Sequence, residues 1–178
     1  MAEIEVKAKV KDFDSIISKL KGMDCTLSEP IAQDDYIFNQ KGIILGGNHD
    51  TPVLRIREQG GKIIFTLKQI RSGELDCIEK EIEVSDRNIL KDIIELLDFE
   101  QTVEVHKKRR KGNCRGYEIC LDEVEELGSF IEVEKMSDED GEKVQNELFD
   151  FLKELGVNPE DRVFKGYDTQ VWLKHNQE

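Results

Sequence analysis

Charged and apolar residues alternate strictly at the start of the chain. Glu3, Glu5 and Lys7 are separated by Ile4 and Val6. Because successive side chains of an extended strand point to opposite faces, this stretch predicts a strand with one charged and one apolar face. A half-buried antiparallel strand with a solvated outer face has the same pattern, so the first strand alone does not define the fold.

The same alternation returns in later stretches, with charges of both signs. Arg55 and Arg57 share one face of their stretch, and Glu132 and Glu134 share one face of theirs. Glycine-containing turns such as 59–62 join some of these stretches, which is typical of an antiparallel meander. The predicted strands are 3–7, 34–38, 53–58, 63–69, 78–84, 102–110, 117–122 and 130–134.

Three stretches have the periodicity of amphipathic helices, at 12–23, 86–99 and 137–155. Ser85 and Ser137 are the predicted N-caps of the second and third helices. The second helix is expected to bury a single stripe, which consists of Ile89, Leu90, Ile93, Ile94 and Leu97.

Two segments lack such periodicity. Residues 40–52 are rich in glycine and predict a turn and a mobile loop, with His49 as a solvent-exposed residue. This is not a phosphate-binding glycine loop, because no GK[ST] and no helix follow. The tail at 161–174 carries Tyr167 and Trp172. The last helix and the Trp172 region either build a dimer interface or complete the cover of the fold.

The charged faces are best explained as the lining of a barrel. Helices must cover apolar sheet faces, so the apolar residues are expected to point outward beneath the helices and the charged ones inward. We therefore predict a single α+β domain over 1–178, an antiparallel β-barrel with a charged lumen, covered by amphipathic helices. Burying so many charges is costly unless they pair or meet a ligand. The predicted lining is Glu3, Glu5, Lys7, Arg55, Arg57, Lys68, Glu81, Glu83, Lys107, Arg109, Asp122, Glu132 and Glu134.

Composition restricts the class of protein. Apolar residues make up 38% and charged residues 37% of 178 residues, and the net charge is -13. This charge argues against a nucleic-acid binder, and no apolar run is long enough to span a membrane. The chain starts with a charged strand rather than a signal peptide. Cys25, Cys77, Cys114 and Cys120 have no zinc-type spacing, so we expect free thiols in a cytoplasmic protein.

The lumen residues suggest a ligand. Carboxylates of the first and last strands, Glu3/Glu5 and Glu132/Glu134, with Asp122 near them, suit one or two hard cations such as Mg²⁺ or Mn²⁺. Arginine and lysine residues of the other strands suit phosphate oxygens. Together these groups predict a polyphosphate with bound metal.

The motifs resemble those of the CYTH superfamily, the triphosphate tunnel metalloenzymes. The resemblance runs over essentially the whole chain in the family's order. Within the superfamily, the length and spacings are most similar to the class IV adenylyl cyclase branch, with thiamine triphosphatase a close relative. The resemblance to the superfamily rests on Glu3-x-Glu5-x-Lys7, Arg55-x-Arg57, Thr66-Leu67-Lys68, Lys107-x-Arg109, Leu121-Asp122-Glu123-Val124 and the stretch from Leu127 to Glu134.

The resemblance implies roles for these residues. The metal ligands would be Glu3, Glu5, Asp122, Glu132 and Glu134. The triphosphate would be bound by Lys7, Arg55, Arg57, Lys68, Lys107 and Arg109, of which Lys7, Arg57, Lys107 and Arg109 would be catalytic.

Two details depart from the family pattern. The basic run 107–111 also permits Lys108 and Arg110 as the lumen pair, although strand parity favours Lys107 and Arg109. Gly166 stands where relatives often have Ser in a K-S-Y motif.

Several functions stay open from the sequence. The first is an adenylyl cyclase that forms cyclic AMP and pyrophosphate from ATP. The second is an inorganic, thiamine or nucleoside triphosphatase, since both reactions need the same clamp on the phosphates. The third is a non-catalytic polyphosphate- or nucleotide-binding module, and the fourth an ordinary β-rich domain with solvated charged faces.

Overall fold

A computed structural model describes residues 1–43, 45 and 51–176 of the chain. Within the loop predicted at 40–52, residue 44 and residues 46–50, which include His49, lie outside these ranges. Among the described residues, no helix is both long and apolar enough to cross a membrane.

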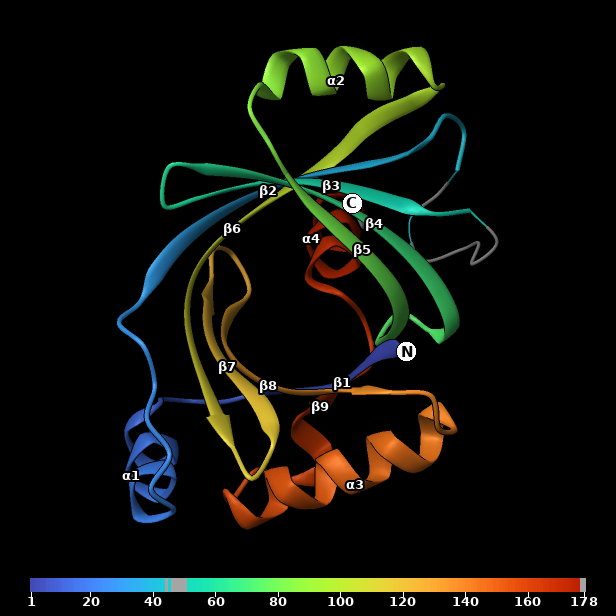
Figure 1. Cartoon of the computed structure of the whole chain (residues 1–178). Coiled ribbons are helices and arrows are strands. Elements are labelled where there is room, and N and C mark those ends of the chain that lie inside the picture. The colour runs from blue at the N-terminus through green and yellow to red at the C-terminus, as the bar shows by residue number, and fades with distance from the viewer. Residues whose placement is uncertain (44, 46–50, 177–178) are drawn as a thin grey trace.

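Eight antiparallel strands form the barrel (Figure 1). The sheet order is β5-β4-β3-β2-β6-β7-β8-β1, and a short pairing of β5 with β1 at Glu3–Cys77 and Ile4–Asp76 closes it. A two-residue strand, β9 (Arg162–Val163), adds to β1. The barrel strands are β1 (Ala2–Lys9), β2 (Ile31–Gln40), β3 (Val53–Gln59), β4 (Lys62–Gly73), β5 (Asp76–Val84), β6 (Phe99–Cys114), β7 (Tyr117–Val124) and β8 (Gly128–Ser137). The predicted barrel is confirmed.

The alternation along β1 and β8 separates an apolar outside from a charged inside. Ile4 and Val6 of β1 and Val133 of β8 are fully buried, and they pack in one cluster with Leu148 and Leu152 of α3. Because their neighbours in sequence must point the other way, the charged residues of β1 and β8 face the lumen. Glu83 is the exception: it is exposed at the end of β5 and pairs with Lys62.

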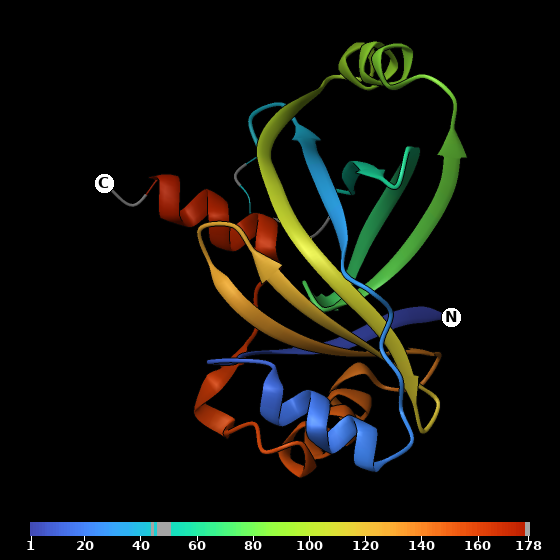
Figure 2. The ribbon, with the colours of Figure 1, turned by 90° about the vertical axis from the view of Figure 1, so that its left-hand side faces the viewer.

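Four helices occur in the described ranges: α1 (Asp14–Gly22), α2 (Arg87–Leu96), α3 (Gly141–Glu154) and α4 (Tyr167–Asn176). The N-caps differ from those predicted. Asp86, not Ser85, accepts hydrogen bonds from the first turn of α2, and Asp140 caps α3, because Ser137 still belongs to β8. Figures 1 and 2 show α1 and α3 on one side of the barrel, α2 on the opposite side, and α4 across one end.

The buried stripe predicted for α2 is wrong in extent. Ile94 is buried and Leu90 is partly buried, both against a small cluster on β2, β3 and β4. Ile89, Ile93 and Leu97 are exposed instead. The barrel covers only the face of α2 that points directly at it, so side chains on the neighbouring face stay exposed.

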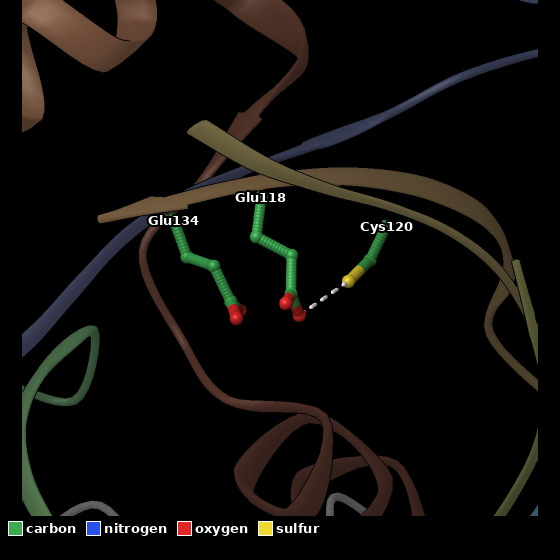
Figure 3. A group of neighbouring side chains, drawn as sticks. All are labelled: Glu118, Cys120 and Glu134. Atoms are coloured by element: carbon green, nitrogen blue, oxygen red, sulfur yellow. Dashed lines mark hydrogen bonds between the residues drawn. The ribbon is translucent and has the colours of Figure 1, made fainter. Parts of the chain in front are cut away.

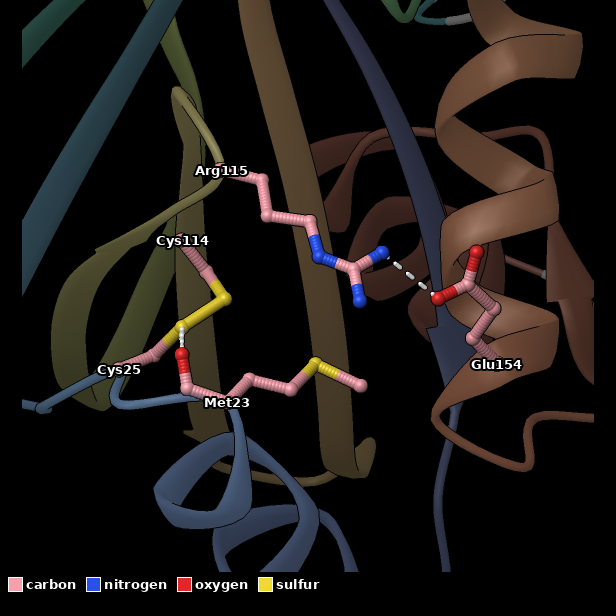
Figure 4. Close-up of a disulfide and its surroundings, with 5 residues drawn as sticks. All are labelled: Met23, Cys25, Cys114, Arg115 and Glu154. Atoms are coloured by element: carbon pink, nitrogen blue, oxygen red, sulfur yellow. Dashed lines mark hydrogen bonds and ion pairs between the residues drawn. A yellow bond between two sulfur atoms is a disulfide. The ribbon is translucent and has the colours of Figure 1, made fainter.

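The prediction of four free thiols is also wrong. Cys25 and Cys114 form a disulfide, whereas Cys77 and Cys120 are free and buried (Figure 4). The two partners are 89 residues apart in sequence. They meet because the α1–β2 connection crosses the end of β6, where Leu27 pairs with Gly112. A Cβ atom on Gly112 would lie 2.5 Å from the carbonyl oxygen of Thr26, so this crossing requires glycine.

Candidate functional site

The site begins with the pairing of β1 and β8. Their antiparallel register sets Glu5 opposite Glu134 and Lys7 opposite Glu132. Because side chains of directly opposite residues point to the same face of the sheet, these four groups meet inside the barrel. One acidic residue of β8 therefore gains a lysine as its neighbour, and the other gains a second glutamate.

Three of the five predicted metal ligands come together. Glu3, Glu5 and Glu134 offer carboxylate oxygens that all lie within 4.8 Å of one another. A second group, Glu118, Cys120 and Glu134, shares Glu134 with the first (Figure 3). Glu118 and Cys120 lie four and two residues before Asp122, on the same face of β7, but no motif assigned them to a site.

The electrostatics of this acidic group are unfavourable. Burial raises the pKa of Glu134 to about 9, and the nearby Glu3 carboxylate contributes to the shift. Burial and the nearby Glu79 carboxylate together raise the pKa of Glu3 to about 7. A hard divalent cation would relieve this repulsion, and carboxylate oxygens are the donors that Mg²⁺ and Mn²⁺ prefer. The donor set therefore fits such an ion.

The other two predicted ligands lie elsewhere in the lumen. Asp122 accepts a 2.7 Å hydrogen bond from Arg109 Nε, because the β6–β7 register sets these residues opposite each other. Glu132 accepts from the same guanidinium group and pairs with Lys7 Nζ at 3.0 Å. Both carboxylates are thus occupied by ion pairs and do not join the acidic group. The assignment of Asp122 and Glu132 as metal ligands stays a prediction from the sequence.

Tyr167 completes this ion-pair network and had no predicted role. Its hydroxyl donates to Asp122 Oδ2 at 2.9 Å, and Lys7 Nζ lies 3.8 Å from its ring centroid. Gly166 and the first turn of α4, with Asp168 and Thr169, also line the cavity. The tail therefore covers one end of the barrel (Figure 2), which is one of the two arrangements expected.

Across the lumen, cations of β3, β4 and β6 form the second wall. Arg57 makes a two-point ion pair with Asp35, at 2.6 and 2.8 Å, and Arg55 Nη2 lies 2.9 Å from Glu81 Oε1. Lys68 pairs with Glu79. The sequence missed Asp35, although its position between the outward-facing residues 34 and 36 was a usable signal.

Lys107 and Arg109 are buried and line the cavity, whereas Lys108 is exposed, so the register favoured by strand parity is confirmed. Burial and the neighbouring charge of Arg109 together lower the pKa of Lys107 to about 8. Among the described lumen lysines with a resolved shift, Lys107 alone has a lowered pKa.

Acidic side chains outnumber basic ones among the described residues that line the lumen. Seven lysine and arginine residues and nine aspartate and glutamate residues are among the described residues that line it. The lumen is therefore not a net positive site, and a polyanion alone would meet strong repulsion from the acidic wall. A polyanion that arrives with divalent cations matches both walls.

The comparisons with known proteins agree with this geometry. The CYTH domain model matches residues 1–167. A protein of Methanocaldococcus jannaschii named "putative adenylate cyclase" is 30% identical over 171 residues, which covers 94% of this chain and 97% of the relative. A solved structure from Pyrococcus horikoshii is 27% identical with a TM-score of 0.78, and covers 93% of this chain and 96% of its own.

A Hippeastrum protein extends the fold comparison at 18% identity. Its TM-score is 0.62, with 98% of this chain and 96% of the other covered, and that protein is described as a putative adenylyl cyclase with a dominant triphosphatase activity. The family match extends over nearly the whole chain, in line with the barrel and the two charged walls. This chain belongs to the CYTH domain family.

Proposed function

We propose that this protein is a divalent-cation-dependent enzyme that acts on a triphosphate, and that it converts ATP to cyclic AMP and pyrophosphate. The observation that carries the proposal is the facing of two walls in one lumen: an acidic group at Glu3, Glu5 and Glu134, and cations that include Arg55 and Arg57. The name of the Methanocaldococcus jannaschii relative supports the cyclase reaction.

Glu3, Glu5 and Glu134 would hold Mg²⁺ or Mn²⁺. Bound there, the ion would neutralise charge on the phosphate oxygens and on the leaving group. We do not include Asp122 and Glu132 in the ligand set, because each already balances the charge of Arg109.

The lysine and arginine residues would bind the phosphates in their charged form, without a prior change of protonation. Burial opposes the charge on Lys7, but Glu132 and Glu5 outweigh it and raise the pKa of Lys7 above its usual value. Lys7 therefore keeps its proton and serves as a phosphate ligand rather than as a general base. Arg109 is fixed by Asp122 and Glu132, so its orientation is set before the substrate arrives.

In the proposed reaction, the ribose 3′ oxygen attacks the α-phosphorus. The bond from this phosphorus to the bridging oxygen breaks, pyrophosphate leaves, and the hydroxyl proton passes to solvent. The fixed guanidinium and ammonium groups stabilise the negative charge that develops on the phosphate oxygens.

One observation favours a triphosphatase as the second candidate. Tyr167 is the only aromatic residue among the described residues that line the lumen, and Lys7 covers its ring. The described lining thus offers no free aromatic surface on which a base would stack, and a triphosphate without a base fits the charged walls equally well. Such an activity is described for the Hippeastrum protein.

The test is to incubate the purified protein with ATP and, separately, with inorganic triphosphate, each with Mg²⁺ or Mn²⁺, and to separate the products. Cyclic AMP with pyrophosphate, lost in Glu5→Gln but kept in the exposed control Glu139→Gln, would establish the cyclase. Orthophosphate without cyclic nucleotide would refute it and support the triphosphatase. Tight ligand binding without either product would indicate a binding module.

A further inference from the structure

The lining of the lumen changes from charged to apolar toward the end of the barrel that α4 covers. Ile37 of β2 and Val105 of β6 line the cavity there, and both pack in one cluster with Tyr167 of α4. On three strands the change takes one step of two residues along the same face: from Asp35 to Ile37 on β2, from Arg55 to Val53 on β3, and from Lys107 to Val105 on β6. We call this region, with Ile37, Val53 and Val105, the apolar end of the lumen.

One amide side chain lies in this region. Asn39 follows Ile37 by two residues on β2, lines the cavity and is 3% exposed. Among the described residues that line the lumen, it is the only asparagine or glutamine. Within the described part of the chain, its Oδ1 accepts a hydrogen bond, but its Nδ2 donates none. The N–H groups of Asn39 therefore stay available to a ligand.

A β-bulge holds this amide in place. The register between β2 and β6 shifts between Ile37 and Phe38, which leaves Thr102 as an extra residue of β6. The Thr102 hydroxyl donates a 2.7 Å hydrogen bond to Asn39 Oδ1. Bulges redirect side chains and are frequent beside functional sites. Because a carbonyl oxygen has two lone pairs, Oδ1 can accept a second hydrogen bond while Thr102 fixes the orientation of the amide.

We propose that the apolar end binds the base of the nucleotide and that Asn39 recognises adenine there. This inference rests on the proposed function, since it takes ATP as the substrate. Adenine has a ring nitrogen that accepts a hydrogen bond next to an amino group that donates one. Asparagine matches this pair with two hydrogen bonds, as it does in nucleic-acid recognition. Nδ2 donates to the ring nitrogen, and Oδ1 accepts from the amino group.

The surroundings of Asn39 suit an uncharged heterocycle. A base placed against the charged walls would remove water from their ionised groups, which is costly. Against Ile37, Val53 and Val105 it buries apolar surface instead, which is favourable. Arg55 and Lys107 lie about 7 Å farther along the same strands, two residues from the apolar end. One nucleotide can therefore place its base at Asn39 and its phosphates among these cations.

The experiment compares three ligands, each with Mn²⁺: ATP, purine riboside triphosphate, which differs from ATP only in lacking the amino group, and inorganic triphosphate. Dissociation constants are measured by rapid filtration before turnover. The wild type should bind ATP roughly 10-fold more tightly than purine riboside triphosphate, because one hydrogen bond is lost. Asn39→Leu should remove this preference and leave the binding of inorganic triphosphate unchanged. Asn88→Leu is the matched control, since Asn88 is exposed on α2, and it should keep the preference.

A second variant tests the orientation of the amide without a change in the lining. Thr102→Val keeps the shape of the side chain but removes the hydroxyl, so the preference for ATP should fall while inorganic triphosphate binds as before. Equal binding of ATP and purine riboside triphosphate by the wild type would overturn the inference. A preference that survives in Asn39→Leu, or an equal loss for all three ligands, would also overturn it. The preference without any cyclic AMP would instead refute the proposed reaction and support the role of Asn39.

Discussion

Removal of the disulfide should cost this protein a large part of its stability. The perturbation is the double substitution Cys25→Ala and Cys114→Ala. The two partners are 89 residues apart, and restricting an unfolded chain by a loop of this length stabilises the folded state by about 4.6 kcal/mol at 25 °C in the chain-entropy model. Domains of this size have total stabilities of only about 5–15 kcal/mol.

The assay is urea unfolding, with and without a reductant. At a slope of about 2 kcal/mol per molar urea, the expected loss moves the midpoint down by about 2 M. The reductant should lower the midpoint of the wild type but leave the double variant unchanged, because Cys77 and Cys120 are free thiols in either case.

A thiol count gives an independent result. Two thiols should react in the denatured, unreduced protein, and four after reduction. If four react without reduction, or if the reductant does not move the wild-type midpoint, then Cys25 and Cys114 are not bonded in the protein and the reasoning is refuted.

The ion pairs of the lumen lead to three further predictions. Glu134→Gln should abolish cation binding without loss of stability, whereas Glu132→Gln should cost about 3 kcal/mol because it removes one buried ion-pair partner from both Lys7 and Arg109. Thermal unfolding with and without Mn²⁺ distinguishes the two, and equal effects would contradict the assignment. Burial opposes the ionised form of Asp35, but the Arg57 guanidinium outweighs it and holds the pKa well below its usual range. Its stabilisation is therefore present above about pH 4 and lost as the pH falls below it, and Asp35→Asn should flatten this acid limb of the unfolding free energy. Burial and nearby guanidinium groups lower the pKa of Lys107 to about 8, so kcat/KM should fall above pH 8, and Lys107→Arg should move that decline upward; an unchanged profile would refute the role.

The barrel was predictable because alternation carries information about both faces of a strand. Ile4 and Val6 had to be covered, so Glu3, Glu5 and Lys7 had to face the other way, and no knowledge of partners was needed. The same local rule selected Lys107 over Lys108. Features that depend on one strand alone are therefore readable from the sequence.

Features that depend on distant partners were not readable. The pairing of Cys25 with Cys114 needs the crossing of the α1–β2 connection over β6. The division of the predicted α2 stripe into buried and exposed residues depends on how much of the helix the barrel covers. The helix at Tyr167 gives little signal of its own, since its apolar residues show no clear helical stripe and it is held by contacts with the end of the barrel.

The acidic residues of β8 show the same limit within a single motif. Glu132 and Glu134 are two residues apart on one face, so the sequence treats them as equivalent ligands. The register with β1 distinguishes them, because it gives Glu132 the neighbour Lys7 and Glu134 the neighbour Glu5. A slip of two residues would set Lys7 opposite Glu134 and Lys9 opposite Glu132, and neither glutamate would then lie opposite Glu5. The position of the cation site therefore depends on strand pairing. The motif supplies both carboxylates of β8, and the register determines that Glu132, not Glu134, lies opposite Lys7 and forms an ion pair with it.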